Sequence, residues 1–224
     1  MNIADRLASP AAERNREPMA QVLRRALPAA GRALEIASGS GQHVHWFARR
    51  LPGWTWQPTE FDAAALASIA AWSVVTPGDL LDDAEDDMAN VAGPLANVLA
   101  PLRLDVCAPQ WPVVGLFDAI TCANMIHASP WPTCPGLMRG AARHLAPAGV
   151  LVTYGPYGVD GEALAPSNLE FDAWLKSRDA SWGIRRLADV VAAAADAGLR
   201  LRERVAVPAN NQMLVFERAA RSPA

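Results

Sequence analysis

The chain has 224 residues, of which 51% are hydrophobic and 19% charged, and its formal net charge is −3. This composition is too apolar for a disordered chain, and the negative charge disfavours a large nucleic-acid-binding surface. No stretch approaches the roughly 20 apolar residues that span a membrane, and the N-terminus has no secretory-signal pattern. Cys107, Cys122 and Cys134 lack a CxxC spacing. We therefore expect free thiols, no metal site and a cytoplasmic location.

Helix and strand patterns alternate along the first half of the chain, which is typical of an α/β fold with a mostly parallel sheet. In chain order we expect a helix over 17–27, a strand over 32–37, a helix over 42–51, a strand over 54–59 and a helix over 63–72. Pro18 would occupy the first turn of its helix, Pro58 would end its strand's ladder, and Asp62 would be an N-cap. The acidic stretch 78–87 is either a solvated loop or a site for a cation or a partner.

The second half continues with the same alternation and then ends differently. We expect strands over 102–106 and 117–123, a helix over 136–145, a strand over 150–154 and a helix over 187–197. The long connection 155–182 would hold a short helix that begins with a capping box from Ser167 to Glu170. Strands over 199–207 and 212–217 would form a terminal antiparallel hairpin.

A glycine-rich turn, LEIASGSG, joins the first strand to the following helix. Gly39 and Gly41 allow a ligand to approach the backbone, and the helix beyond them offers free N–H groups. Dinucleotide-binding turns have a third glycine where this chain has Val44. The turn that binds S-adenosyl-L-methionine (SAM) begins with an acid, which Glu35 supplies. In this chain Ala37, which precedes Ser38, occupies the position of that turn's first glycine.

Two further acids follow the next strands. Glu60 comes after the second strand, where a carboxylate can accept hydrogen bonds from both ribose hydroxyls. Asp62 competes for that role, but its expected N-cap position explains it. After the third strand, Asp105 can accept from the adenine amino group and the Val106 N–H can reach a ring nitrogen. Asp105 can equally be a turn residue. The combined set of acids and glycines fits SAM better than NAD.

These residues resemble those of the class I SAM-dependent methyltransferases, and more closely the methyltransferase-like protein 26 family, a domain of unknown function. The stretches that carry the resemblance are SPAAERNREP, LEIASGSGQH, WQPTEFD, ANMIHASPW, YGPY, DGEALAPSN, WGIRRL and PANNQMLVFER. The resemblance implies a Rossmann-like α/β fold with a seven-stranded, mostly parallel sheet, an antiparallel last strand and helices on both faces. It implies SAM as the methyl donor and no particular substrate. The acidic stretch 79–87 departs from the pattern as an insertion.

The resemblance also sets the expected domain organisation. We expect one SAM-dependent methyltransferase domain over 1–224, with an N-terminal lid or helix over 1–30. A loop with a short helix over 155–183 would lie on the substrate side. The oligomeric state stays open.

The fourth strand should end at the methyl donor, because ligands of open α/β sheets bind at the carboxyl ends of the strands. Backbone carbonyls near Asn124 and Met125 can face the sulfonium. The Asn/Asp-Pro-Pro-aromatic motif of adenine and amide methyltransferases is missing here. A nucleic-acid or glutamine-amide substrate is therefore disfavoured, and we expect a small-molecule acceptor.

Four histidines are candidates for chemistry. His127 is placed to act as a general base near neutral pH, or else it only hydrogen-bonds its loop. His43 and His45 are two positions apart on a helix and so face different sides, which argues against metal ligation. His144, near a helix C-terminus, is most simply a partner of the helix dipole.

Polar side chains should surround the mouth of the expected cleft. The candidates for orienting the acceptor are Asn15, Trp131, Tyr154, Tyr157, Asn168, Asn210 and Asn211. Three of these have plainer explanations, since the adjacent Asn210 and Asn211 suit a left-handed turn and Asn15 can belong to a helix start. We therefore expect SAM-dependent methyl transfer to a small molecule, without nucleic-acid or membrane partners. The alternatives are an NAD-dependent oxidoreductase and a non-catalytic SAM-binding module.

Overall fold

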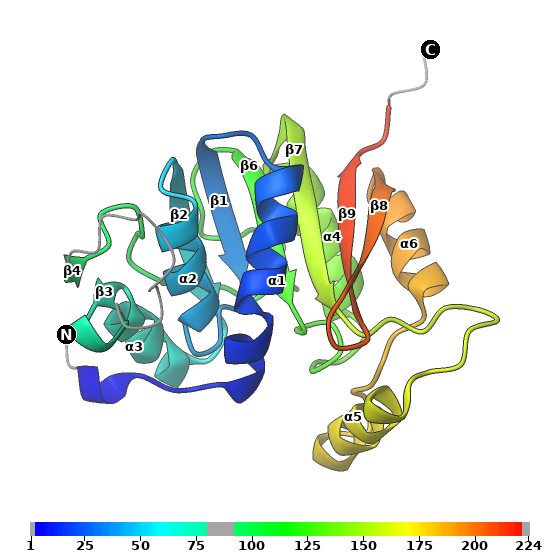
Figure 1. Ribbon diagram of the computed structural model, residues 1–224. Coiled ribbons are helices and arrows are strands. Elements are labelled where there is room, and N and C mark those ends of the chain that lie inside the picture. The colour runs from blue at the N-terminus through cyan, green and yellow to red at the C-terminus, as the bar shows by residue number, and fades with distance from the viewer. Residues whose placement is uncertain (1–2, 80–91, 221–224) are drawn as a thin grey trace. The chain divides into compact units, whose positions relative to one another are not determined.

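The computed structural model describes residues 3–79 and 92–220. The chain divides into two compact units, residues 1–104 and 105–224. Figure 1 labels their helices and strands. Within the described ranges, no helix combines the length and apolar character needed to cross a membrane.

The first unit holds the glycine-rich turn between a strand and a helix. Its elements are η1 (Ile3–Asp5), α1 (Pro10–Ala26), β1 (Gly31–Ile36), α2 (Gln42–Arg50), β2 (Trp54–Glu60), α3 (Ala63–Trp72), β3 (Val74–Val75), β4 (Gly93–Pro94) and β5 (Leu102–Arg103). The order β5-β2-β1 contributes three parallel strands to the main sheet, while β3 and β4 form a separate antiparallel pair. Because β1 and β2 are parallel, both end at the same edge, with Glu35 opposite Pro58.

The second unit contributes the remaining four strands of the sheet. Its elements are β6 (Phe117–Ala123), α4 (Thr133–His144), β7 (Leu145–Gly155), α5 (Pro166–Arg178), α6 (Leu187–Asp196), β8 (Leu199–Val207) and β9 (Asn211–Arg218). The order is β6-β7-β9-β8, with β9 antiparallel to both of its neighbours. The expected class is thus confirmed, because the seven strands form a mostly parallel, Rossmann-like sheet whose last strand is antiparallel.

Large apolar side chains fill both units. In the first, Phe47 lies 5.6 Å from the Trp56 ring, and Trp54 and Ile69 are also fully buried. In the second, the fully buried side chains include Ile120, Leu137, Leu151, Leu214 and Phe216. Burial of a side chain of this size stabilises the fold by about 1.5–3 kcal/mol.

Helix α1 begins seven residues earlier than expected and therefore contains Pro18 in its interior. Ser9 is the N-cap, its hydroxyl accepting from the Ala12 N–H at 3.3 Å, and Pro10 occupies the first turn. Proline at that position needs no N–H partner, so the sequence signal for the helix start lies at Ser9-Pro10. The expectation that Pro18 occupies the first turn was wrong.

The ladder between β1 and β2 ends at Pro58, as expected, but strand β2 continues to Glu60 and pairs there with β5. Along a parallel strand, successive N–H groups point to opposite neighbours. The Trp56 N–H donates to Asn97 on the β5 side. The missing N–H of Pro58 faces that same side, where the Gln57 side-chain amide donates to the Ala100 carbonyl at 2.8 Å instead.

Several other boundaries differ from expectation. The strand expected over 102–106 is β5, which has only two residues because Asp105 begins a turn. Helix α5 has Ala165 as its N-cap and Pro166 in its first turn, so the expected capping box at Ser167 was wrong. Of the acidic stretch, Asp79 forms a 3.0 Å ion pair with Arg6, and residues 80–91 lie outside the described ranges.

Candidate functional site

The turn after β1 leaves open space beside one of its glycines. Ala37, Gly39 and Gly41 have positive φ angles of 55°, 56° and 94°. A Cβ added to Gly39 would meet no atom within 4 Å, whereas one added to Gly41 would lie 2.7 Å from the Ile69 Cα. Gly41 is therefore needed for packing on α3, and Gly39 for access to the backbone.

Glu60, at the end of β2, is held against this turn. One carboxylate oxygen accepts from the Gly39 N–H at 2.8 Å, and the other accepts from Phe61 and Asp62 at 2.7 and 3.3 Å. A carboxylate offers about four acceptor positions. A ribose hydroxyl can take the remaining one, and a second hydroxyl would replace the longest bond, that from Asp62. Asp62 also caps α3 as expected, accepting from Ala64.

Glu35 is a buried carboxyl with an unsatisfied oxygen. Glu35 is 4% exposed, and within the described parts of the chain neither its Oε2 nor the Ser38 hydroxyl has a hydrogen-bond partner of good geometry. Burial raises the pKa of Glu35 to about 7; the nearby Ser38 hydroxyl opposes this shift, and repulsion from Glu60 adds to it. An unpaired buried carboxyl of this kind is the arrangement that a nearby ligand cation would stabilise.

Asn15 lies on α1 and is buried. Its side-chain oxygen lies 2.7 Å from Nε2 of His43 on α2. Burial lowers the pKa of His43 to about 4, and that of His45 on the same helix also to about 4. His45 instead contacts the Trp72 carbonyl. The two histidines thus have separate partners, and no cluster of metal-ligating side chains occurs among residues 3–79 and 92–220.

Phe61 is a residue that the sequence analysis did not single out. Its ring is 58% exposed directly after Glu60, and the Arg103 guanidinium lies 5.4 Å from the ring centroid. The Arg103 Nε also donates to the Phe61 carbonyl at 3.2 Å. An aromatic residue directly after the carboxylate predicted to bind ribose is the signal that would have identified it, because an exposed ring can stack on a base.

In the second unit, Asp105 and Val106 form a turn after β5. The Asp105 carboxylate accepts from the Cys107 N–H at 2.8 Å, which is the turn role considered for it. The side chain is exposed, and its second oxygen has no partner within the described residues. The Val106 N–H likewise donates no hydrogen bond there. Both groups are free to contact an adenine edge, and that role stays a prediction.

The loop after β6 begins at Asn124, whose φ is 59°. Its carbonyl accepts from both His127 and Ala128, so its lone pairs are used within the loop. The Met125 carbonyl accepts from Ala128 and from the Ser129 hydroxyl. The Asn124 side-chain amide has no partner among the described residues. The amide is therefore better available to a ligand than the carbonyls that the sequence suggested.

His127 is fully buried beneath the same loop. Its Nδ1 accepts from the Arg185 N–H at 3.3 Å, which leaves the proton of the neutral ring on Nε2. That Nε2 has no partner among the described residues and lies against Gly155, where a Cβ would be only 2.3 Å away. Burial, together with a smaller effect of the Arg185 charge, lowers the pKa of His127 to about 3. The geometry favours the loop-bonding interpretation over the general base, which stays a prediction.

A substitution separates these two roles. We expect His127→Asn to leave the pH–rate profile unchanged and to lower the free energy of unfolding by about 1–3 kcal/mol, because a buried hydrogen-bonding group is altered. Activity against pH and denaturant unfolding would be measured on the same preparation. A base role would instead appear as a rate loss of about 10²-fold or more together with loss of one limb of the profile.

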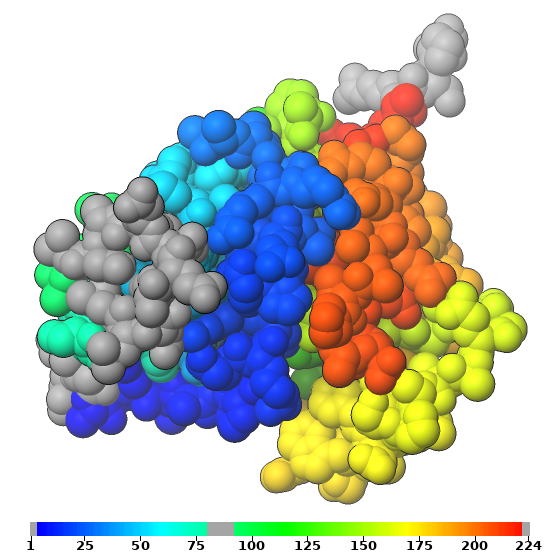
Figure 2. Space-filling view, viewed as in Figure 1, coloured from blue at the N-terminus to red at the C-terminus, as the bar shows by residue number. Residues whose placement is uncertain are grey.

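Four of the residues predicted to orient the methyl acceptor line one cavity. Tyr157, Asn168, Asn210 and Asn211 surround a space of about 210 Å³ between the start of α5 and the tip of the β8–β9 hairpin. The Asn168 amide donates to the Asn210 carbonyl at 2.9 Å, and the φ of Asn210 is 62°, as expected for a left-handed turn. Figure 2 shows α5, in yellow, next to the β8–β9 hairpin, in orange. Tyr154 is buried in β7 and does not line the cavity.

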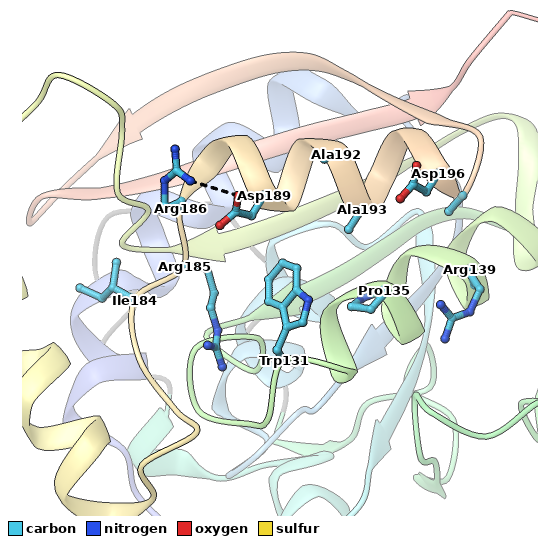
Figure 3. A pocket seen from close by; sticks show the side chains of 11 residues that line it. Trp131, Pro135, Arg139, Ile184, Arg185, Arg186, Asp189, Ala192, Ala193 and Asp196 are labelled. Carbon is cyan, nitrogen blue, oxygen red and sulfur yellow. Dashed lines mark hydrogen bonds and ion pairs between the residues drawn. The ribbon is translucent and has the colours of Figure 1, made fainter.

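Trp131 lies elsewhere, in a groove of about 790 Å³ between α4 and α6. Figure 3 shows Trp131, Pro135 and Arg139 on one side and Asp189, Ala193 and Asp196 of α6 on the other. The Arg185 guanidinium lies 5.7 Å from the Trp131 ring and donates to the Ile126 and Ser129 carbonyls. Trp131 is thus not in the cavity that holds the asparagines. His144, at the end of α4, donates from Nδ1 to the Gly140 carbonyl of its own helix at 2.9 Å.

Solved structures share this fold. An O-methyltransferase family protein from Burkholderia thailandensis matches with a TM-score of 0.69 and 17% identity over 95% of this chain and 58% of its own. CalO1, a methyltransferase in calicheamicin biosynthesis, matches with a TM-score of 0.68 and 16% identity over 93% and 56%. Human N-acetylserotonin methyltransferase, solved with SAM, matches with 0.68 and 11% over 94% and 53%. The chain thus spans little more than half the length of these proteins, and the likeness establishes the fold.

The family is shown by a broader match. The model of a family described as a protein of unknown function, DUF938, covers residues 6–218, which include all of the described helices and strands from α1 to β9. The chain belongs to the DUF938 family.

Proposed function

We propose that this chain is a SAM-dependent methyltransferase that acts on a small molecule. The observation that carries the proposal is the turn after β1, where open space beside Gly39 adjoins a carboxylate, Glu60, already oriented by the Gly39 N–H. The unpaired Glu35 oxygen supplies a further buried acceptor nearby. The fold neighbours bound to SAM or its product agree with the proposal. So does the resemblance of the sequence to the methyltransferase-like protein 26 family.

The chain's own residues would each have one task. Glu60 would bind the ribose hydroxyls of SAM, and the Gly39 backbone would allow SAM to approach closely. Glu35 would face the cationic amino-acid end of SAM. Phe61 would cover one face of the base. Asp105, Val106, Asn124 and Met125 stay predicted contacts of the same cofactor. When bound, SAM supplies a methyl group that is already activated by its sulfonium, so the protein has to orient the acceptor and exclude water.

The proposal extends to organisation. We propose that residues 1–224 act as one methyltransferase domain, with the N-terminal region over 1–30 and the segment over 155–183 contributing to ligand enclosure. We also propose a cytoplasmic location. Asn15 would help position the cofactor end through its contact with His43.

Loss of the Glu60 carboxylate tests the ribose role. We expect Glu60→Ala to weaken SAM binding by about 1.5–3 kcal/mol, because hydrogen bonds to a charged group are lost. Calorimetry would measure the affinity, and Asp62→Ala is the matched control, since it removes a neighbouring acid whose role is capping α3. Equal affinities of Glu60→Ala and the unaltered chain would exclude Glu60 from the site.

Thermal unfolding of the full chain with candidate ligands tests the proposal as a whole. We expect SAM and its demethylated product to raise the melting temperature and NADH to leave it unchanged, as binding to the folded state requires. Transfer of a labelled methyl group to a metabolite extract would distinguish an enzyme from a SAM-binding module. Stabilisation by NADH alone would overturn the proposal.

A further inference from the structure

The cavity beside α5 has an unusual set of polar groups. Its walls include four carboxamide side chains, around the buried ring of Tyr157: those of Asn168, Asn210, Asn211 and Gln212. Among the described residues that line it, the one basic side chain is Arg204, which pairs with Glu162 at 3.3 Å. The polar lining thus combines uncharged amides with one ion pair.

Backbone carbonyls fix the orientation of three of these amides, while the Asn210 amide donates to the Ser167 hydroxyl at 3.3 Å. The Gln212 nitrogen donates to Tyr157 at 2.9 Å, the Asn168 nitrogen to Asn210 at 2.9 Å, and the Asn211 nitrogen to Ala209 at 3.3 Å. A carbonyl accepts only from the nitrogen end of an amide, so the oxygen ends are determined as well. The oxygen of each amide, and the second N–H of its nitrogen, remain for a ligand.

All three oxygens lack a donor. The Gln212 Oε1 is buried without a partner. The Asn168 and Asn211 side-chain oxygens likewise accept no hydrogen bond in the described parts of the chain. Leaving a buried acceptor unpaired costs about 1–3 kcal/mol, so a ligand that brings donors into the cavity recovers that free energy.

We infer that this cavity receives the hydrogen-bond-donating end of the methyl acceptor, a small molecule that carries hydroxyl or amine groups rather than a carboxylate or phosphate. Its role as acceptor pocket rests on the proposed function. The three amide oxygens would accept from the ligand's O–H or N–H groups, whereas a carboxylate or phosphate has no donor to offer them. The volume of about 210 Å³ is below the roughly 300–1,000 Å³ of pockets for drug-sized ligands. The entering group is therefore small.

The test is a titration of the ¹⁵N-labelled full chain with four small probes, followed through the side-chain amide signals of Gln212 and Asn211. Propane-1,3-diol and ethanolamine represent the hydroxyl and amine sources, and propionate and methyl phosphate represent the anions. We expect each donor probe to bind at least about fivefold more tightly than either anion, as one added hydrogen bond implies. Anion binding of equal or greater strength, or no shift with any probe, would overturn the inference.

Two variants locate the effect. Gln212→Met keeps the side-chain size without the oxygen, and we expect it to weaken the preferred donor probe by about fivefold. The matched control, Gln21→Met, changes an exposed glutamine on α1 and should have no effect. Asn211→Asp should strengthen the binding of ethanolamine and leave the binding of the diol unchanged. This second variant provides the test if Gln212→Met loses stability. Equal binding by all variants would contradict the inference.

A parallel SAM titration separates this inference from the proposed function. If donor probes bind selectively but SAM does not, the proposed function fails and the cavity's chemistry stands. If SAM binds and the probes show no selectivity, the inference fails alone.

Discussion

Replacing Gly41 by alanine is expected to lower the free energy of unfolding by about 3 kcal/mol or more. The φ of 94° is strained for any L-residue, and the new Cβ would lie 2.7 Å from the Ile69 backbone and 3.2 Å from the Trp72 Cβ. Backbone strain and overpacking each cost about 1–3 kcal/mol. Urea unfolding followed by circular dichroism would measure the change.

Gly39→Ala is the matched comparison two residues away. Its φ of 56° resembles the 55° that Ala37 already adopts, and no atom lies within 4 Å of the added Cβ. We expect a loss of only about 1 kcal/mol in stability. The methyl group would, however, occupy the space proposed for the cofactor, so SAM binding should be lost. Similar stability losses in the two variants would contradict this assignment of the two glycines.

The second large effect is a loss of stability in acid. His45 and His127 are buried and His43 is half-buried, with pKa values of about 4, 3 and 4. In the unfolded chain they take up protons near pH 6.5, so their contribution is present above that pH and is lost as the pH falls toward 4. At pH 5, protonation of His45 and His127 in the unfolded chain should lower the free energy of unfolding by about 4 kcal/mol in total. His43 should add a smaller loss.

Glu35 acts in the opposite direction. Its pKa of about 7 keeps it protonated in the folded chain where the unfolded chain has ionised it, so its contribution is lost as the pH rises through 7. The net change from about pH 7.5 to pH 5 should be a loss of roughly 3 kcal/mol. Denaturant unfolding at constant ionic strength would measure it. A free energy of unfolding that stays constant or increases as the pH falls over this range would show that the pKa values of these histidines are not lowered in the folded chain.

Glu35→Gln tests the sign of the carboxyl contribution. Because the variant cannot titrate, its stability relative to the unaltered chain should increase as the pH rises from about 5 to 8. A difference that does not change with pH would mean that Glu35 has an ordinary pKa and is not the buried carboxyl described above.

The turn between β1 and α2 was the part best predicted from sequence. The spacing of Glu35, Gly39, Gly41 and Glu60 identified a strand, a glycine-rich turn and a second strand, and in the structure the Gly39 N–H contacts the Glu60 carboxylate. This was possible because these residues are fixed by local backbone conformation and by parallel pairing of adjacent strands.

Long-range contacts were less predictable. Pro58 ends the ladder with β1 as expected, but nothing local shows that β2 would continue beside β5 or that Gln57 would donate to Ala100, 43 residues away. Trp131 was grouped with the asparagines, yet it lines the groove between α4 and α6. Likewise, burial and the contact with Arg185 set the protonation of His127, and neither is visible in the residue type.

Isothermal titration of the full chain with SAM, beside Gly39→Ala, is the most direct test of the cofactor site. The unaltered chain should bind one SAM per chain, and Gly39→Ala should remain folded and give no binding heat. A folded chain that fails to bind SAM, or a Gly39→Ala variant that binds it unchanged, would contradict a SAM site at this turn.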